Sequence, residues 1–587
     1  RLQSAGAVVV GQMSMSWHYG DHESGKGLFG VWPQLWAEHL GGDPPCASAD
    51  EAQQLAADGS LRRWPIDGRP YFAYSGCMCN PHWLATLSAM LDRAIELGVD
   101  GINVHHNFEN FCPCAHCRTE LGAWLEKAFD SAELTALFGT SELAAVPALG
   151  VIDAAPDVLR QRHAHEVQRA IHHRRKAAFD AVFIDHGRQR KPDLLLAQWY
   201  HKYDFSPQDE RSLLPPELWA HDEDYIWYSQ GGNKGASDIA HGYVADMGLP
   251  ARFVHAAGEG RPFIINKYDY KRWRLSIAEG AANHFASLAF HWSQESDTSF
   301  AVEDYTAPVY RYQRFLVEQE QLIHPAEPWS QIGLVYPRRG ELAADGFCTR
   351  ALQRLGRLLE DAHQLFDMLL DHQICHRDLT AYRLLLLPDV ARLSDEEITR
   401  LQSFIGAGGR ILCSGATGTL FEDGTLRPIP ALAAGEGIHW LDDVSCDLPS
   451  FEIQPDIHLP WVPELVDDPF GQDVLRHVDI LTGGVGLLTD APWWVRVRAW
   501  RPEAEQALVL HWVNYRQVED SVIEVPCPTG PIQVGCPLPA GSVVTRVHWR
   551  FPEGPDTTTL PHRMDGDIVH FTVPRLIVYG LAVIHLR

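Results

Sequence analysis

Residues 101–118, GINVHHNFENFCPCAHCR, hold the side chains of this chain that are best suited to chemistry. An apolar run at residues 102–104 ends abruptly in imidazole, amide and carboxylate groups, which are His105, His106, Asn107 and Glu109. The run follows a segment with helical spacing and a Gly-containing turn, which is how a strand follows a helix in a βα repeat. In an α/β barrel this end of the strand is the active face, so we expect the chemistry there.

Three cysteines follow at once with the spacing C-x-C-x-x-C, namely Cys112, Cys114 and Cys117. Such close spacing in a long chain without a disulfide framework indicates thiolate ligation of a metal such as zinc. A tetrahedral structural site needs a fourth ligand. Cys77 or Cys79 in the segment SGCMCN is favoured, and His116 and Cys46 rank behind them. The alternative is a set of free cysteines packed in a loop.

Composition narrows the class of protein. The formal charge of -27 over 587 residues argues against a nucleic-acid partner, which would need a concentrated basic surface. No window reaches the roughly 18 uninterrupted apolar residues of a membrane span. Twelve irregularly spaced cysteines fit a reducing compartment, so we expect a cytoplasmic protein. The 19 tryptophans and 17 tyrosines suit the binding of sugar rings, although most aromatic side chains of a large protein lie in its core.

Apolar runs recur along the first half of the chain, within residues 7–13, 61–74, 194–200, 225–230, 261–269 and 286–292. They are continuous rather than alternating, which is typical of strands buried on both faces in a parallel sheet covered by helices. We therefore predict that residues 1–325 form a (β/α)8 TIM barrel.

Polar and aromatic side chains stand at the ends of these runs, where a barrel has its mouth. Besides His105, His106 and Asn107, the residues expected to contact substrate are Gln198, Tyr200, His201, Tyr228, Lys267, His291 and Trp292. His18 and Glu23, on the loop after the first strand, are candidates for holding a terminal sugar.

Two further domains follow a Pro-rich boundary near residues 324–330. Residues 326–440 contain a βαβ unit in which Ser394 and Glu397 form a capping box and Gly406 stops the helix. We predict a flavodoxin-like α/β domain with a role in packing or assembly. In residues 441–587 short strands alternate with turns rich in Pro, Gly and Asp, which predicts a β-sandwich.

The order barrel, flavodoxin-like domain and β-domain resembles the β-galactosidases of glycoside hydrolase family 42, over nearly the whole chain. The segments that carry the resemblance are CPCAHC with RTELGAWL, then RLLLLPDVARLSDEEITRLQSFIGAGGRIL, ALVLHWVNY and VPRLIVYGLAVIHL. The second of these looks like the trimerisation domain of that family. The resemblance implies a retaining glycosidase, a homotrimer and a structural zinc-type site after the fourth barrel strand.

A retaining glycosidase needs two carboxyl groups about 5–5.5 Å apart, one a nucleophile and one an acid/base. The resemblance places the acid/base on a Glu after an Asn at the end of the fourth strand. Here one residue separates Asn107 from Glu109, which is the candidate. The nucleophile should follow the seventh strand, where Asp269 stands, and Glu295 or Asp297 after the eighth strand are substitutes.

Three functions are consistent with these residues. The first is a glycoside hydrolase on a β-galactoside-like or related glycoside. The second is a carbohydrate lyase or a metal-assisted enzyme that uses His, Tyr or Lys at the barrel mouth. The third is a non-catalytic sugar-binding barrel. Two carboxyl groups that face each other would indicate the hydrolase. A His, Tyr or Lys at the centre of the mouth would indicate the lyase or metal-assisted enzyme. An aromatic cleft with neither feature would indicate the sugar-binding barrel.

Overall fold

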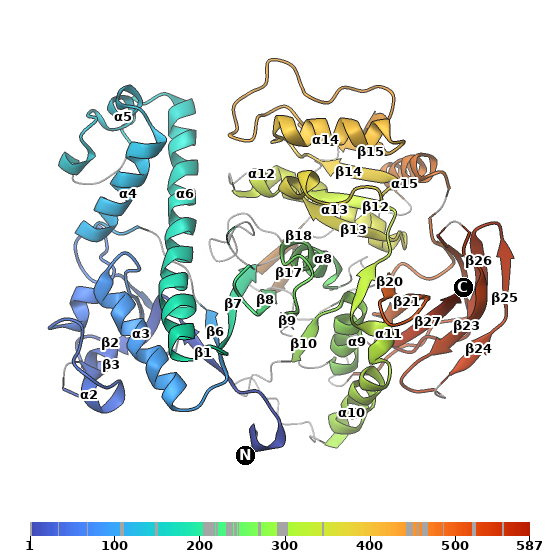
Figure 1. Ribbon diagram of the computed structural model, residues 1–587, viewed down its shortest axis with the longest axis horizontal. Helices are drawn as coiled ribbons and strands as arrows, with labels where there is room; N and C mark the ends of the chain where they lie inside the picture. Colours follow the sequence, from blue (N-terminus) through green and yellow to red (C-terminus); the bar gives the residue numbers. More distant parts are fainter. Residues whose placement is uncertain are drawn as a thin grey trace. The chain divides into compact units, whose positions relative to one another are not determined.

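Figure 1 shows the computed structural model of the chain, which forms two compact units. One unit comprises residues 1–200 and 210–227, and the other comprises residues 201–209 and 228–587. The structure describes residues 3–32, 34–66, 68–105, 111–146, 151–202, 218, 221–230, 237, 239, 244, 246–267, 272–289, 303–342, 346–441, 450–454, 457–460, 468–484, 486–518, 524–539, 541–554 and 557–587.

Parallel strands form the centre of the first unit. β6 (Gly101–His105) lies between β1 (Val10–Ser14) and β7 (Leu195–Lys202), and β8 (Tyr225–Gln230) follows β7 in the sheet order. Ile102, Val104 and Leu196 point to the face covered by α3 (Pro81–Glu96), α6 (Asp157–Phe179) and the π-helical η4 (Asp180–Gly187). Because strand side chains alternate, Asn103 and His105 point to the opposite face.

The predicted strand near residue 72 does not join this parallel sheet. β5 (Phe72–Ser75) pairs antiparallel with β2 (Trp17–Asp21) and β4 (Arg63–Pro65), and β3 (Lys26–Gly27) completes a separate four-stranded sheet. β6 therefore lies beside β1 as the second strand of the parallel sheet in chain order, so the expected fourth position is wrong. Beneath this separate sheet, Tyr74 packs on Phe29, with ring centroids 4.7 Å apart.

The helices of the first unit begin and end at recognisable signals. Asn80 caps α3, accepting a hydrogen bond from the His82 N–H at 3.0 Å, and Pro81 takes the first helical position. α4 (Ala115–Ala128) and α5 (Ser131–Phe138) pack with α6 around their own apolar cluster. The shorter helices are η1 (Gln3–Ala5), α1 (Leu28–Val31), α2 (Trp36–His39), η2 (Ala49–Ala52), η3 (Leu143–Ala145) and α7 (Arg188–Arg190).

The described part of the second unit contains two helix–strand pairs and a five-stranded parallel sheet. α8 (Gly248–Ala257) and α9 (Trp273–Asn283) precede β9 (Phe263–Lys267) and β10 (Ala286–Ala289), which pair in parallel. The five-stranded sheet has the order β13 (Phe366–Leu370), β12 (Ile332–Tyr336), β14 (Leu384–Pro388), β15 (Arg410–Ser414), β16 (Ile438–Trp440). In chain order this is 2-1-3-4-5, the flavodoxin-like arrangement.

Helices complete this part of the second unit. α13 (Gly346–Asp361) and α14 (Asp395–Gly406) pack on the five strands. The short helix α12 (Arg338–Leu342) lies between β12 and α13, and η6 (Asp371–Cys375) lies between β13 and β14. The predicted capping box is present, with the Glu397 N–H 3.1 Å from Ser394 Oγ and the Ser394 N–H 2.7 Å from Glu397 Oε2. The remaining elements are α10 (Glu303–Glu318), α11 (Glu320–Ile323), β17 (Ser450–Gln454), β18 (Ile457–Pro460) and α15 (Pro469–Thr482).

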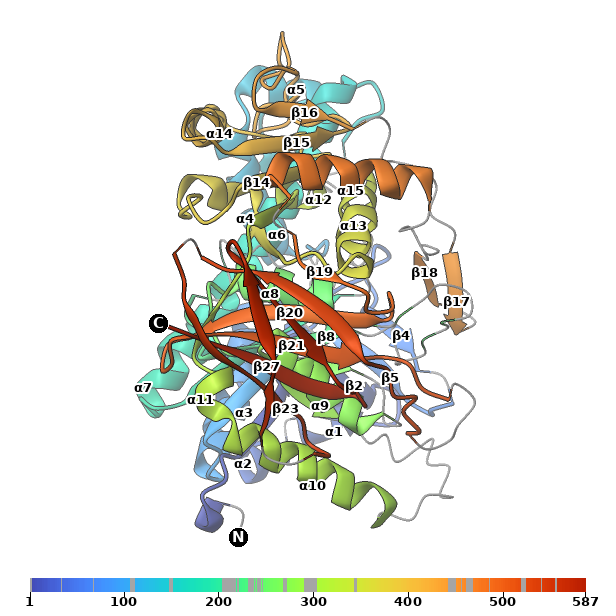
Figure 2. The same ribbon diagram turned by 90° about the vertical axis from the view of Figure 1, so that its right-hand side faces the viewer.

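Two antiparallel sheets end the chain (Figure 2). One has the order β11 (Ala326–Pro328), β20 (Val495–Pro502), β21 (Ala507–Asn514), β27 (Tyr579–Leu586), β23 (Val544–Arg550), β24 (Thr558–Leu560). The other has the order β19 (Leu488–Thr489), β22 (Ile532–Pro537), β26 (Ile568–Val573), β25 (His562–Asp565). Leu510, Val534 and Phe571 share the core between them, and Phe315 of α10 packs on the other side of the larger sheet, beside Leu581.

The fold is thus an α/β protein with parallel sheets followed by antiparallel sheets. Closure of the first strands into an eight-stranded barrel and the domain limits at 325 and 440 stay predictions. None of the described helices is both long and apolar enough to cross a membrane.

Candidate metal centre and sheet end

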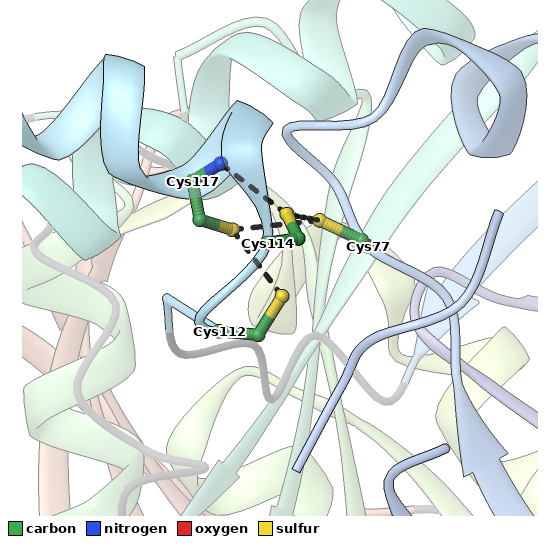
Figure 3. Close-up of side chains that lie close together, drawn as sticks. All are labelled: Cys77, Cys112, Cys114 and Cys117. Atoms are coloured by element: carbon green, nitrogen blue, oxygen red, sulfur yellow. Dashed lines mark hydrogen bonds between the residues drawn. The ribbon is translucent and has the colours of Figure 1, made fainter. Parts of the chain in front are cut away.

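Four cysteines from two parts of the first unit meet in one place (Figure 3). Cys77 follows β5, Cys112 and Cys114 precede α4, and Cys117 lies in the first turn of α4. Their sulfur atoms all lie within 4.8 Å of one another. We call these four residues the thiol centre.

The separations fit one tetrahedral ion. Cys77 Sγ lies 3.8 Å from Cys114 Sγ and 3.5 Å from Cys117 Sγ, and Cys112 Sγ lies 3.6 Å from Cys117 Sγ. Zn–S bonds of about 2.3 Å in a tetrahedron require sulfurs roughly 3.8 Å apart. The backbone therefore already holds the sulfurs at the spacing that such an ion requires.

Local structure fixes both halves of the centre. Cys114 caps α4, and its Sγ accepts a hydrogen bond from the Cys117 N–H at 3.4 Å. On the other side, Gly76 lets the Trp83 ring of α3 approach the backbone beside Cys77. A Cβ at Gly76 would lie 1.9 Å from that ring, so only glycine fits there without rearrangement. Trp83 is anchored in turn by a hydrogen bond from Nε1 to the Met15 carbonyl at 3.0 Å.

Hydrogen bonds among the four thiols shift the pKa of each of them. Hydrogen bonds with Cys112, Cys114 and Cys117 raise the pKa of Cys77. The pKa of Cys117 is lowered to about 4: its hydrogen bond with Cys112 acts to raise it, and those with Cys114 and Cys77 outweigh this. Thiols that share protons in this way are the groups that a metal ion deprotonates and binds.

The structure also places the other candidates for the fourth ligand. Cys79 is half-buried and packs against the thiol centre without being one of its four members. His116 and Cys79 line an open cavity along α4. Cys46 lies elsewhere, packing with Trp32, and its thiol donates to the Ser48 carbonyl at 3.2 Å. Cys77 is therefore the residue that completes the set.

On the face of β6 opposite the helices, Asn103 lies in the middle of the strand and His105 at its carboxyl end. Burial lowers the pKa of His105 to about 4, so its imidazole is neutral near pH 7, and its ring centroid lies 5.5 Å from that of Trp199. The ring centroids of Trp199 and Trp227 are 6.1 Å apart. Asn103 is fully buried, and neither side-chain atom has a hydrogen-bond partner within the part of the chain that the structure describes. Sequence reasoning missed Asn103, although an amide inside an apolar strand was a signal.

Other predicted residues lie away from this face. His18 points beneath the antiparallel sheet, where it stacks on Tyr74 with centroids 5.7 Å apart and bonds Gln53 Oε1 at 2.7 Å. Burial lowers its pKa to about 4. Glu23 lies exposed in the turn after β2. Gln198 is buried in register with Val104, on the face covered by the helices.

The remaining candidates are described only in part or not at all. Tyr200, His201, Tyr228 and Lys267 lie on β7, β8 and β9, but their side chains are outside the described structure. His106, Asn107, Glu109, Asp269, His291, Trp292, Glu295 and Asp297 lie outside the described residues altogether.

Comparison with known proteins identifies the fold. No protein-family model and no curated protein sequence matches the chain. Among solved structures, a β-galactosidase from Bacillus circulans sp. alkalophilus matches with a TM-score of 0.61 and 12% identity, over 94% of this chain and 87% of that one. A family 42 β-galactosidase from G. stearothermophilus, solved as a catalytic mutant, matches with a TM-score of 0.57 and 13% identity, over 94% of this chain and 87% of that one.

A third match is the α-L-fucosidase isoenzyme 2 from Paenibacillus thiaminolyticus, with a TM-score of 0.59 and 16% identity, over 100% of this chain and 88% of that one. The structure of this chain therefore matches that of family 42 β-galactosidases over nearly its full length, as the sequence resemblance implied, at low sequence identity.

Proposed function

We propose that the protein is a glycoside hydrolase acting on a β-galactoside-like or related glycoside. The observation that supports this is the match of fold to glycosidases over nearly the whole chain. Fold alone does not fix chemistry, so the assignment also draws on the polar sheet end with His105 and Asn103. His105 ends β6, and ligands of parallel α/β sheets bind at the carboxyl ends of the strands.

The mechanism we propose uses two carboxyl groups. Glu109 protonates the glycosidic oxygen as the aglycone leaves, and Asp269 or Glu295 attacks the anomeric carbon to form a glycosyl ester. Glu109 then takes a proton from water, which hydrolyses that ester. Asn103 and the neutral His105 offer hydrogen bonds to sugar hydroxyls from the floor of the site.

We further propose that the thiol centre binds a structural zinc ion through Cys77, Cys112, Cys114 and Cys117. Four thiolates satisfy tetrahedral zinc and leave no position for water or substrate, so the ion supplies stability rather than catalysis. It would tie the loop after β5 to the start of α4. A homotrimer and a cytoplasmic location stay predictions of the sequence.

The test is activity against a panel of nitrophenyl α- and β-glycosides, with Glu109→Gln, Asp269→Asn and Glu295→Gln beside the parent. We expect a β-galactoside or a close relative to be cleaved. We also expect Glu109→Gln and one of the other two variants to lose activity by about a thousandfold or more, the scale on which essential catalytic groups act. Full activity in all three variants would remove the two-carboxyl mechanism.

The second candidate, elimination by a carbohydrate lyase, is favoured by one observation. His105 lies at the carboxyl end of β6 and is neutral near pH 7, the protonation state in which an imidazole acts as a general base. A lyase would release an unsaturated, ultraviolet-absorbing product from uronic-acid polymers. It would lose this activity in His105→Gln, while hydrolysis of nitrophenyl glycosides would be absent in the parent.

A further inference from the structure

One face of the antiparallel sheet in the first unit is covered by aromatic rings. Trp17 and Tyr19 of β2, Trp64 of β4 and Tyr71 just before β5 share this face, because they alternate with the residues that point beneath the sheet. We call these four residues the aromatic layer. The centroids of Trp17 and Trp64 lie 5.5 Å apart, and those of Tyr19 and Tyr71 lie 6.2 Å apart.

The layer exists because the strand beneath it carries a small side chain. Ala73, in the middle of β5, stands opposite both Tyr19 and Trp64 in register. It is 2% exposed, so the rings cover it. Its small side chain lets indoles from the two flanking strands tilt toward each other across the sheet.

The aromatic layer is not the core of this sheet. The core lies on the opposite face, where His18, Phe29 and Tyr74 pack together. On the aromatic layer, Tyr19 is 50% exposed, and Trp17, Trp64 and Tyr71 are each half-buried. A group of large, partly exposed rings marks a binding surface more often than a single exposed ring does.

Polar side chains border the layer on the same face. The guanidinium of Arg62 lies 5.0 Å from the Trp64 ring centre, and its Nη1 donates to Gln54 Oε1 at 3.2 Å. Asp21 stands at the other end, beyond Tyr19, and hydrogen bonds lower the pKa of its carboxyl, foremost that from Ser24. A charged donor and a charged acceptor therefore flank flat apolar surface, an arrangement that complements a ligand with apolar faces and hydroxyl edges.

The layer also begins close to the end of the parallel sheet. Trp17 lies three residues after β1, and its N–H donates to Ser14 Oγ at 3.0 Å. Ser14 is in turn the register partner of His105. A chain-like ligand with one end at the strand ends would thus find its next units beside Trp17.

We propose that the aromatic layer binds pyranose rings of a neutral carbohydrate chain, as a surface that holds sugar units beyond those at the sheet end. The C–H groups of one pyranose face pack on the electron-rich faces of aromatic rings, and the hydroxyls at its rim bond to groups such as Asp21 and Arg62. This rests on the proposed function only in the choice of sugar, because binding needs no hydrolysis.

The experiment is affinity electrophoresis of the full-length protein in native gels containing soluble β-linked galactan, with dextran gels as the control for sieving. Galactan should retard the parent. Tyr19→Ala should raise the dissociation constant obtained from this retardation by about 3–10-fold, the range expected for the loss of one aromatic stacking contact. Tyr19→Phe keeps the ring and should bind nearly as the parent does.

Two controls make the result decisive. Tyr310 on α10 is 68% exposed outside the layer, so Tyr310→Ala should leave retardation unchanged. Circular dichroism should show that Tyr19→Ala is folded.

The proposal is overturned if galactan does not retard the parent or if Tyr19→Ala binds as the parent does. It is also overturned if Tyr19→Ala halves the molecular mass in solution, which would make the layer a contact between copies. Retention of binding in a protein that cleaves no glycoside would overturn the proposed hydrolysis and leave this proposal standing.

Discussion

The thiol centre of the first unit and an ion-pair ring in the second unit both hold polar groups away from water, but they differ in how charge is balanced. The ring consists of Asp246, Arg357, Asp361 and Arg496. Asp246 Oδ2 lies 3.1 Å from both Arg357 Nη1 and Arg496 Nε, while Asp361 Oδ1 lies 2.8 Å from Arg496 Nη2 and 3.0 Å from Arg357 Nε. Two anions and two cations alternate, so the ring is neutral by itself.

The thiol centre has four groups of one kind, which repel one another once ionised. Each of the two clusters joins separate elements: the ring links Asp246, two residues before α8, to α13 and β20, and the thiol centre links the loop after β5 to the start of α4. Burial opposes ionisation of Asp246, yet Arg496 and Arg357 lower its pKa. The comparison teaches that four like groups balance their charge only with a counter-ion once they ionise, whereas alternating anions and cations balance one another.

Losing a thiol ligand should have the largest effect. We expect Cys77→Ala and Cys117→Ala to abolish the one zinc per chain that mass spectrometry of the native protein should find. Structural zinc contributes on the order of 10 kcal/mol in small zinc-dependent peptides, so thermal unfolding of the first unit should shift strongly downward. Cys413 is a buried thiol in another cluster, and Cys413→Ala should keep the metal. A Cys77→Ala protein with full zinc content would refute the site.

Breaking the ion-pair ring should rank second. Arg496→Met leaves Asp246 and Asp361 short of a buried counter-charge, and we expect a loss of about 3–5 kcal/mol in the free energy of unfolding. The matched control is Arg476→Met, because Arg476 pairs with Asp473 at 2.6 Å while both are half exposed. That variant should lose about 0–1 kcal/mol in urea unfolding. Equal losses in the two variants would show that burial does not decide the energetics of these pairs.

The same contrast explains what the sequence predicts well and what it does not. The C-x-C-x-x-C spacing and the Ser394 capping box are local, and both appear where they are expected. The choice of Cys77 over Cys79 depends on how the loop after β5 turns on Gly76, and spacing alone does not encode that turn. His18 looked available for substrate because it follows a buried strand, but pairing of β2 with β5 turns it beneath the sheet.

A pH effect from Glu360 should be smaller than the loss of Arg496. Glu360 lies 2.6 Å from Arg252, yet burial raises its pKa from 4.5 to about 7. The folded state then holds the proton that the unfolded state releases above pH 4.5, so this group makes stability fall as pH rises from 4.5 to about 7. Glu360→Gln should remove that pH dependence, about 3 kcal/mol in the free energy of unfolding, in unfolding curves measured across this range. A slope unchanged by the substitution would place the titration on another group.

The smallest effect should come from the fifth cysteine beside the thiol centre. Cys79 is half-buried and packs against the centre, but the four other sulfurs already fill a tetrahedron. We therefore expect Cys79→Ala to keep one zinc per chain and to change unfolding by only about 1 kcal/mol, the scale of a lost partly buried side chain. Metal analysis beside Cys77→Ala checks this directly. If Cys79→Ala lost the metal and Cys77→Ala kept it, Cys79 would be the fourth ligand, which the sequence also allows. The loop after β5 would then have to turn the opposite way.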